Sequence, residues 1–190
     1  MRIVAGAFRG RAIVAPGGAV TRPTADRVRQ ALFDSLMHAP WAGRAAVEGA
    51  SVLDVFAGTG ALGLEALSRG AARAVFVENA RDALAALRAN VASLRVADRT
   101  RILPADATRP PRADTPCDLL FLDPPYGQDL GPRTLGALRD AGWIAPDAIA
   151  CLEIGRDEAP PALLDWTTLA DRTHGAARIL VLRAGPGVSR

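Results

Sequence analysis

The sequence has 190 residues, of which 49% are hydrophobic and 23% are charged, and its formal net charge is +3. These values are typical of one globular domain and exclude a disordered chain, and no apolar run approaches the roughly 18 residues that a membrane-spanning helix needs. All 23 basic residues are arginines, which excludes a P-loop lysine, a Schiff-base lysine and a kinase-type lysine. We therefore expect a single domain over residues 1–190, in which residues 1–20 extend a core over residues 21–190.

The first 30 residues are the most basic part of the sequence. Short apolar segments at 2–5 and 11–15 flank a glycine-containing turn and predict an N-terminal β-hairpin. The segment contains one acid, Asp26, and six arginines: Arg2, Arg9, Arg11, Arg22, Arg27 and Arg29. A basic segment beside a nearly neutral body is typical of proteins that contact a phosphate backbone, and the alternative is a solvated surface without a partner.

A helix is predicted from residue 24 to about residue 37, with Thr24 or Asp26 as its cap. Its predicted buried face consists of Val28, Ala31, Leu32 and Leu36. Arg27 and Arg29 are two residues apart and would face different ways on this helix. We expect at least one of Arg22, Arg27 and Arg29 to contact a nucleic-acid phosphate, the alternative being a salt-bridged helix cap.

From residue 51 onward, strand and helix patterns alternate. Strands are predicted over residues 51–56, 74–77, 101–103, 118–122, 148–153 and 177–182, and helices over residues 61–69, 81–94 and 130–141. The connection between the last two strands is rich in proline and has no predicted element. This alternation predicts an α/β fold with a parallel sheet, helices on both faces and a binding crevice at the carboxyl ends of the strands.

A glycine-rich loop follows the first of these strands. Gly58, Gly60 and Gly63 have the spacing of the dinucleotide fingerprint, and Glu78 ends the next strand at the position of its ribose-binding acid. We therefore expect an adenosine-bearing cofactor, the alternative being a tight turn without a ligand. A pyrophosphate would be repelled by a carboxylate such as Asp54, whereas a cation such as the sulfonium of S-adenosylmethionine suits it.

The fourth strand runs directly into Asp123-Pro124-Pro125-Tyr126. The lone pair of an exocyclic amine on a base is delocalised into the ring. The Asp123 carboxylate and the Pro124 carbonyl could localise this lone pair by accepting hydrogen bonds from the N–H groups of the amine. The two prolines make the turn rigid, and Tyr126 offers a flat face on which a base can stack. This motif predicts methyl transfer to a base amine by positioning and electrostatics, the alternative being a stiff turn.

Cysteine and histidine are sparse in this sequence. Cys117, Cys151, His38 and His174 stand apart from one another. A zinc site needs about four such ligands close together, so we expect no metal. The arginines near the N-terminus interrupt the apolar stretch that a signal peptide requires, and we expect a cytoplasmic protein.

The segment around the glycine loop, Asp-x-Phe-Ala-Gly-x-Gly, resembles the first motif of class I methyltransferases. This resemblance implies a Rossmann-like, mostly parallel sheet of seven strands with a late antiparallel strand and the small N-terminal hairpin. It also implies that Glu78 holds the ribose of S-adenosylmethionine and that Asp106 holds its adenine amine. The candidate cofactor-binding residues are Asp54, Phe56, Ala57, Gly58, Thr59, Gly60, Glu78, Asn79, Asp106 and Ala107.

Over nearly its whole length, the chain resembles the bacterial small-subunit ribosomal RNA guanine-N2 methyltransferase family. Three blocks carry the resemblance: residues 22–29 (Arg-Pro-Thr-Ala-Asp-Arg-Val-Arg), residues 53–63 and residues 123–126. The family implies methylation of guanine 966 in 16S ribosomal RNA, on an assembling small subunit, by a monomer. The catalytic candidates are then Asp123, Pro124 and Tyr126, and the RNA-binding candidates are Arg9, Arg11, Arg22, Thr24, Arg27 and Arg29.

The sequence departs from the family at one point and leaves other functions open. The family often has Glu-x-Asp-Arg after the second strand, where this chain has Glu78-Asn79-Ala80-Arg81, so a role for the second acid is in doubt. The Asp-Pro-Pro-Tyr block also occurs in adenine-N6 DNA methyltransferases. A nicotinamide-dependent oxidoreductase and a non-catalytic RNA-binding protein are the alternatives from other classes.

Overall fold

The computed structural model describes residues 1–16 and 23–185 and contains a seven-stranded sheet. Its strands are β1 (Ser51–Val55), β2 (Arg73–Glu78), β3 (Thr100–Pro104), β4 (Cys117–Leu122), β5 (Ile144–Gly155), β6 (Trp166–His174) and β7 (Ala177–Ala184). The strand order is β3-β2-β1-β4-β5-β7-β6. Pairs from β3 to β5 are parallel, and β7 is antiparallel to both of its neighbours. The predicted mostly parallel α/β sheet with a late antiparallel strand is therefore confirmed.

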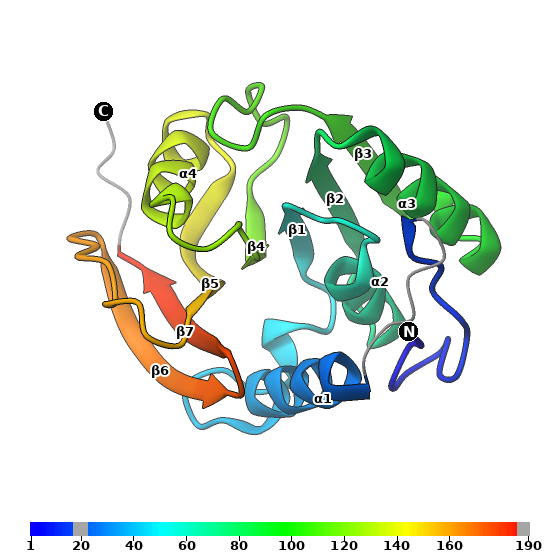
Figure 1. The fold of residues 1–190 in the computed structure, drawn as a ribbon, viewed down its shortest axis with the longest axis horizontal. Helices are drawn as coiled ribbons and strands as arrows, with labels where there is room; N and C mark the ends of the chain where they lie inside the picture. Colours follow the sequence, from blue (N-terminus) through cyan, green and yellow to red (C-terminus); the bar gives the residue numbers. More distant parts are fainter. Residues whose placement is uncertain (17–22, 186–190) are drawn as a thin grey trace.

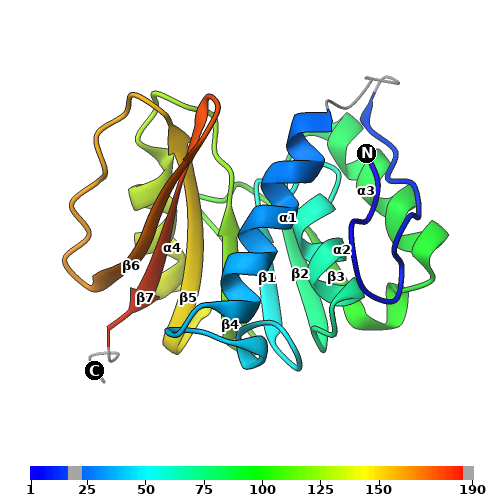
Figure 2. The same ribbon diagram turned by 90° about the horizontal axis from the view of Figure 1, so that it is seen from below.

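Helices cover both faces of the sheet (Figures 1 and 2). The helices are α1 (Pro23–His38), α2 (Ala61–Ser68), α3 (Arg81–Leu94) and α4 (Leu130–Asp140). One apolar core joins α1, α2 and α3 to the sheet through residues such as Phe33, Leu64 and Leu87. A second core packs Leu135 and Leu138 of α4 against the opposite face. Within the described residues, no helix is both long enough and apolar enough to cross a bilayer.

Three sequence predictions need correction. Strand β6 lies in the connection for which no element was predicted. Helix α1 begins at Pro23, a residue that favours the first helical position, so Thr24 does not precede the helix as its cap. On the inner face of α1, Phe33 is buried where Ala31 was expected, and Ala31 is exposed.

The N-terminal segment turns back on itself and forms the predicted hairpin in a short form. One antiparallel β-bridge joins Arg2 to Ala12, and the backbone N–H groups of Ile3 and Ile13 donate to the carbonyls of Arg11 and Met1, both at 2.9 Å. Other backbone groups of the segment bond to α2. The buried Glu65 carboxylate of α2 accepts the backbone N–H groups of Val4 at 2.8 Å and Ala5 at 3.0 Å. These bonds tether the segment to the helix that follows the glycine loop.

Candidate active site

The two predicted motifs lie side by side at one edge of the sheet. The glycine loop follows β1, and Asp123 follows β4. These strands are parallel neighbours in which Val55 pairs with Leu122. The backbone N–H of Asp123 donates to the carbonyl of Val55 at 3.4 Å. A ligand of the glycine loop and a ligand of the Asp-Pro-Pro-Tyr turn could therefore meet.

Glycine is required in the loop because there is no room for a side chain. At Gly60, where φ is +78°, a Cβ atom would lie 2.4 Å from Leu87 Cδ1. At Gly63 it would lie 2.5 Å from the ring of Phe76. Both distances are far inside van der Waals contact. The loop thus packs directly on α3 and β2, which leaves its outer side for a ligand.

Buried polar side chains hold the loop in place. The N–H of Gly63 donates to Asp54 Oδ2 at 2.8 Å, and the N–H of Gly58 donates to Glu78 Oε2 at 2.8 Å. The Asn90 amide of α3 donates to the carbonyls of Thr59 and Val14, both at 3.0 Å, and accepts the N–H of Val14 at 2.8 Å. Asn90 therefore joins the glycine loop to the N-terminal segment.

The charges of two other carboxylates act on Asp54 beside this loop. Burial raises the pKa of Asp54 to about 8, and the charges of Asp123 and Glu78 add to this rise, while the Gly63 N–H opposes it. Asp54 is only 2% exposed. A cationic ligand would offset this repulsion and favour the charged form of Asp54.

An open cavity of about 500 Å³ lies between the two motifs. Its lining residues are Phe56, Glu78, Asn79, Ala80, Asp123, Pro124, Pro125 and Tyr126. Of the predicted cofactor-binding residues, Phe56, Glu78 and Asn79 line it. The others do not: Asp54, Ala57, Gly58, Thr59, Gly60, and Asp106 and Ala107 after β3. Asp106 is exposed, and its Oδ1 accepts the backbone N–H and the hydroxyl of Thr108, which lower its pKa.

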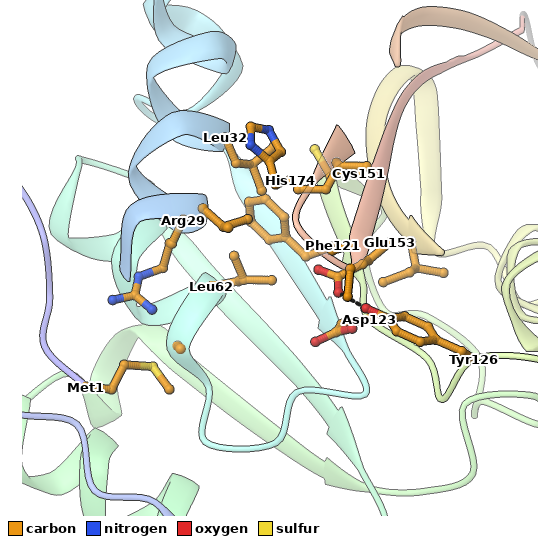
Figure 3. A pocket seen from close by; sticks show the side chains of 16 residues that line it. Met1, Arg29, Leu32, Leu62, Phe121, Asp123, Tyr126, Cys151, Glu153 and His174 are labelled. Carbon is orange, nitrogen blue, oxygen red and sulfur yellow. Dashed lines mark hydrogen bonds between the residues drawn. The ribbon is translucent and has the colours of Figure 1, made fainter. Parts of the chain in front are cut away.

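A second cavity, of about 340 Å³, lies between α1 and strands β4, β5 and β7 (Figure 3). Its walls are mainly apolar and include Leu32, Phe121 and Ile179. Asp123 and Tyr126 line both cavities. The Asp-Pro-Pro-Tyr turn therefore lies between an open space beside the glycine loop and a second space that is large enough for a planar ring.

Asp123 and Tyr126 both interact with a third side chain, Glu153, which belongs to none of the predicted motifs. The Tyr126 hydroxyl donates to Glu153 Oε1 at 2.5 Å. The surrounding protein raises the pKa of Asp123 to about 7, and the charge of Glu153 adds to this rise. The sequence feature that could have indicated Glu153 is its position as an acid at the end of the strand predicted over residues 148–153.

The predicted RNA-binding residues do not gather in one place. Arg29 is 4% exposed, donates to Glu65 at 3.4 Å and to Asp26 at 2.9 Å, and also bonds the carbonyl of Arg2. This buried and paired guanidinium holds the fold together, which favours the salt-bridged alternative, and its contact with RNA stays a prediction. Arg22 lies outside the described residues, Thr24 lies in the first turn of α1, and Arg27 is exposed on the same helix.

Arg9 and Arg11 lie away from the two cavities. The backbone of Phe8, next to Arg9, donates to Ser68, the last residue of α2, and the Arg11 side chain donates to the carbonyl of Ser93 near the end of α3. Both helices begin at the edge of the sheet that holds the site, so their last turns lie toward the opposite edge. The structure therefore does not bring these two arginines to the candidate site.

A seven-stranded sheet in this order, with a glycine loop after β1 and Asp-Pro-Pro-Tyr after β4, defines a methyltransferase of the Rossmann-like class. Solved structures agree with this class. A putative methyltransferase from Escherichia coli is 33% identical, has a TM-score of 0.82 and is matched over 98% of this chain and 99% of its own. A putative methylase from Haemophilus influenzae is 28% identical, with a TM-score of 0.77 over 97% and 98% of the two chains.

The chain belongs to the family described as "Conserved hypothetical protein 95", whose model matches residues 1–183. Relatives with similar sequences are also methyltransferases by name. The E. coli protein "Ribosomal RNA small subunit methyltransferase D" is 36% identical over 92% of this chain and 85% of its own. The Bacillus subtilis protein "Putative rRNA methyltransferase YlbH" is 30% identical over 96% and 98% of the two chains. The protein is therefore a methyltransferase enzyme.

Proposed function

We propose that this protein transfers a methyl group from S-adenosylmethionine to the N2 amine of one guanine in 16S ribosomal RNA, guanine 966 by its resemblance to the family. One observation supports the proposal above the others: Asp123 and Tyr126 line both the cavity beside the glycine loop and the cavity beside α1. A methyl donor and a base in these two cavities would meet at Asp123. The names of the E. coli and B. subtilis relatives favour ribosomal RNA as the substrate.

The residues in and beside the first cavity fit S-adenosylmethionine. Gly58 and Gly60 would let the backbone approach it, and Phe56, Ala57, Thr59 and Asn79 would complete the cradle around it. Glu78 would accept hydrogen bonds from the ribose hydroxyls, the buried Asp54 would attract the cationic end from behind the loop, and Asp106 with Ala107 would meet an adenine that extends beyond the cavity. The charges of Asp123 and Glu78 beside Asp54 support this orientation because they suit a positive charge.

The residues around Asp123 would activate the base amine. The Asp123 carboxylate and the Pro124 carbonyl would accept hydrogen bonds from the N–H groups of the amine and direct its lone pair toward the methyl group. Tyr126 would stack on the ring of the base. S-adenosylmethionine would supply the methyl group from its sulfonium, and the bond between sulfur and the methyl carbon would break to leave a neutral thioether. As the new C–N bond forms, the amine nitrogen loses a proton, which Asp123 can accept near neutral pH because its pKa is about 7.

The proposed activity is tested on small ribosomal subunits from cells that lack the enzyme. The purified protein and tritiated S-adenosylmethionine should label 16S RNA in these particles, and mass spectrometry should map the methyl group to N2 of one guanine. Free 16S RNA tests whether assembled ribosomal proteins are needed, and plasmid DNA tests the adenine-N6 alternative. Label found only in DNA would contradict the proposal.

Binding of S-adenosylmethionine should strengthen as the pH rises from 6 to 8. Asp54 is protonated in the free protein below about pH 8, and a cation favours its ionised form, so binding releases a proton. Linkage then allows the affinity to rise by up to about tenfold per pH unit below the free pKa and to level off above it. Calorimetry in buffers of different ionisation enthalpy measures the released proton.

The matched control for this pH dependence is Asp54→Asn. The variant should bind more weakly and should lose the pH dependence, because the titrating group is gone while the Gly63 N–H keeps an acceptor. An unchanged pH profile in the variant would show that another group titrates.

We also propose that Arg27 contacts an RNA phosphate. It is exposed on α1, the helix that supplies Val28 and Arg29 to the wall of the second cavity, and it faces another way than the buried Arg29. Arg27→Ser should weaken binding to the ribosomal particle and reduce the slope of log K against log salt by about 1. Filter binding at several salt concentrations measures this slope. Arg9→Ser, at the far end of α2, is the control, and a change confined to that variant would place the contact at the N-terminal turn instead.

A further inference from the structure

Two carboxyl groups project into the second cavity from neighbouring strands. Leu122 of β4 pairs with Leu152 of β5, so the next residues along the two parallel strands, Asp123 and Glu153, lie at the same level of the sheet. Both line the cavity, and Figure 3 shows their carboxyl groups together beside Tyr126. Their charges interact, since Glu153 contributes to the raised pKa of Asp123.

The hydrogen bond from Tyr126 fixes one side of the Glu153 carboxylate. Its Oε1 accepts the tyrosine hydroxyl at 2.5 Å, which leaves Oε2 for a ligand. The side chain is therefore oriented by a residue of the catalytic turn itself. A base stacked on Tyr126, with its amine at Asp123, would present its next edge atom to Glu153.

That next atom differs between the two purines. In guanine, the N2 amine lies beside N1–H, so the edge offers two neighbouring donors. In adenine, the N6 amine lies beside N1, which carries no hydrogen and accepts. Two carboxylates side by side match two donors, whereas a carboxylate opposite the adenine N1 would place two acceptors against each other. The Asp-Pro-Pro-Tyr turn alone cannot make this distinction because it contacts only the amine.

We propose that Glu153 is a specificity-determining residue that accepts the N1–H of the target guanine while Asp123 accepts its N2 amine. This inference rests on the proposed function, since it takes N2 of guanine as the methylated atom. A site built to pair with a polar group of the substrate discriminates strongly against an analogue that lacks this group.

The test compares guanine with 2-aminopurine at the target position of 16S RNA in reconstituted small-subunit particles. 2-Aminopurine keeps the amine at C2 but has no hydrogen on N1. Single-turnover rates are measured for the wild-type protein, for Glu153→Gln and for Asp157→Asn. Asp157 is an exposed acid on the loop after β5 and controls for the loss of one negative charge. Thermal unfolding and S-adenosylmethionine binding show that each variant is folded.

The wild-type protein should methylate guanine about 10- to 100-fold faster than 2-aminopurine. In Glu153→Gln this ratio should fall at least tenfold, because the glutamine amide can donate to the bare N1, whereas Asp157→Asn should keep the wild-type ratio. A Glu153→Gln variant that slows both substrates equally would overturn the inference and assign Glu153 to positioning Tyr126. Failure of the wild-type protein to methylate the guanine particle would instead overturn the proposed function.

Discussion

Replacing Asp123 by alanine should lower the single-turnover rate of methyl transfer by about 10²- to 10⁴-fold, the range typical of a positioned proton acceptor. The variant loses the carboxylate that accepts the amine and its proton. Binding of S-adenosylmethionine should remain, because Glu78 and the glycine loop do not depend on Asp123 for their hydrogen bonds. Rapid-quench measurements on small-subunit particles and calorimetry with the donor give the two quantities separately.

Asp123→Asn refines this prediction, because asparagine keeps an acceptor oxygen and loses the charge. Its rate should fall between those of the wild-type protein and of Asp123→Ala. Asp157→Ala, which removes an acid from the nearby loop, should retain the wild-type rate. If Asp123→Ala stayed within tenfold of the wild-type rate, the proposed role of the Asp-Pro-Pro-Tyr turn would be refuted.

Replacing Glu65 by alanine should lower the free energy of unfolding by about 3–5 kcal/mol. The Glu65 side chain is fully buried, and besides the backbone of Val4 and Ala5 it accepts hydrogen bonds from Arg69 at 2.8 Å and Arg29 at 3.4 Å. Its removal leaves two buried guanidinium groups with a missing partner and two backbone N–H groups without one. Urea denaturation measures the loss of stability.

A second measurement localises the effect of Glu65→Ala. Amide hydrogen exchange should increase at residues 3–5 more than in β4 or β5, because the tether of the N-terminal segment is gone. Glu48→Ala is the matched control. It breaks the exposed ion pair with Arg44 at 2.8 Å and should cost less than about 1 kcal/mol. Equal losses in the two variants would contradict the central role assigned to Glu65.

The sequence was sufficient to predict the sheet and its two motifs because both depend on local patterns. Buried parallel strands read as apolar runs, and α3 was predicted at its observed bounds, residues 81–94. Strand β6 was missed because it lies at the edge of the sheet and most of its residues, such as Thr167, Thr168 and Arg172, are exposed. No alternation of apolar and polar residues marks it.

The candidate site was only partly predictable because some of its contacts join residues that are distant in sequence. The sequence does not reveal the ion pair between Arg29 and Glu65, because Glu65 is distant in sequence and lies within a mostly apolar helix. Glu153 gained meaning only when the register of β4 and β5 placed it beside Asp123. The far position of Arg9 and Arg11 follows from the way in which the N-terminal segment runs along α2, which no local pattern encodes.

The Asn90 side chain makes order in two separate segments mutually dependent. One amide bonds the carbonyl of Thr59 in the glycine loop and both backbone groups of Val14. A molecule that immobilises either segment reduces the conformational entropy that the other still has to lose, and thermodynamic linkage makes this benefit equal in both directions. The affinity for the methyl donor and the affinity for a molecule that binds near Val14 should therefore be coupled.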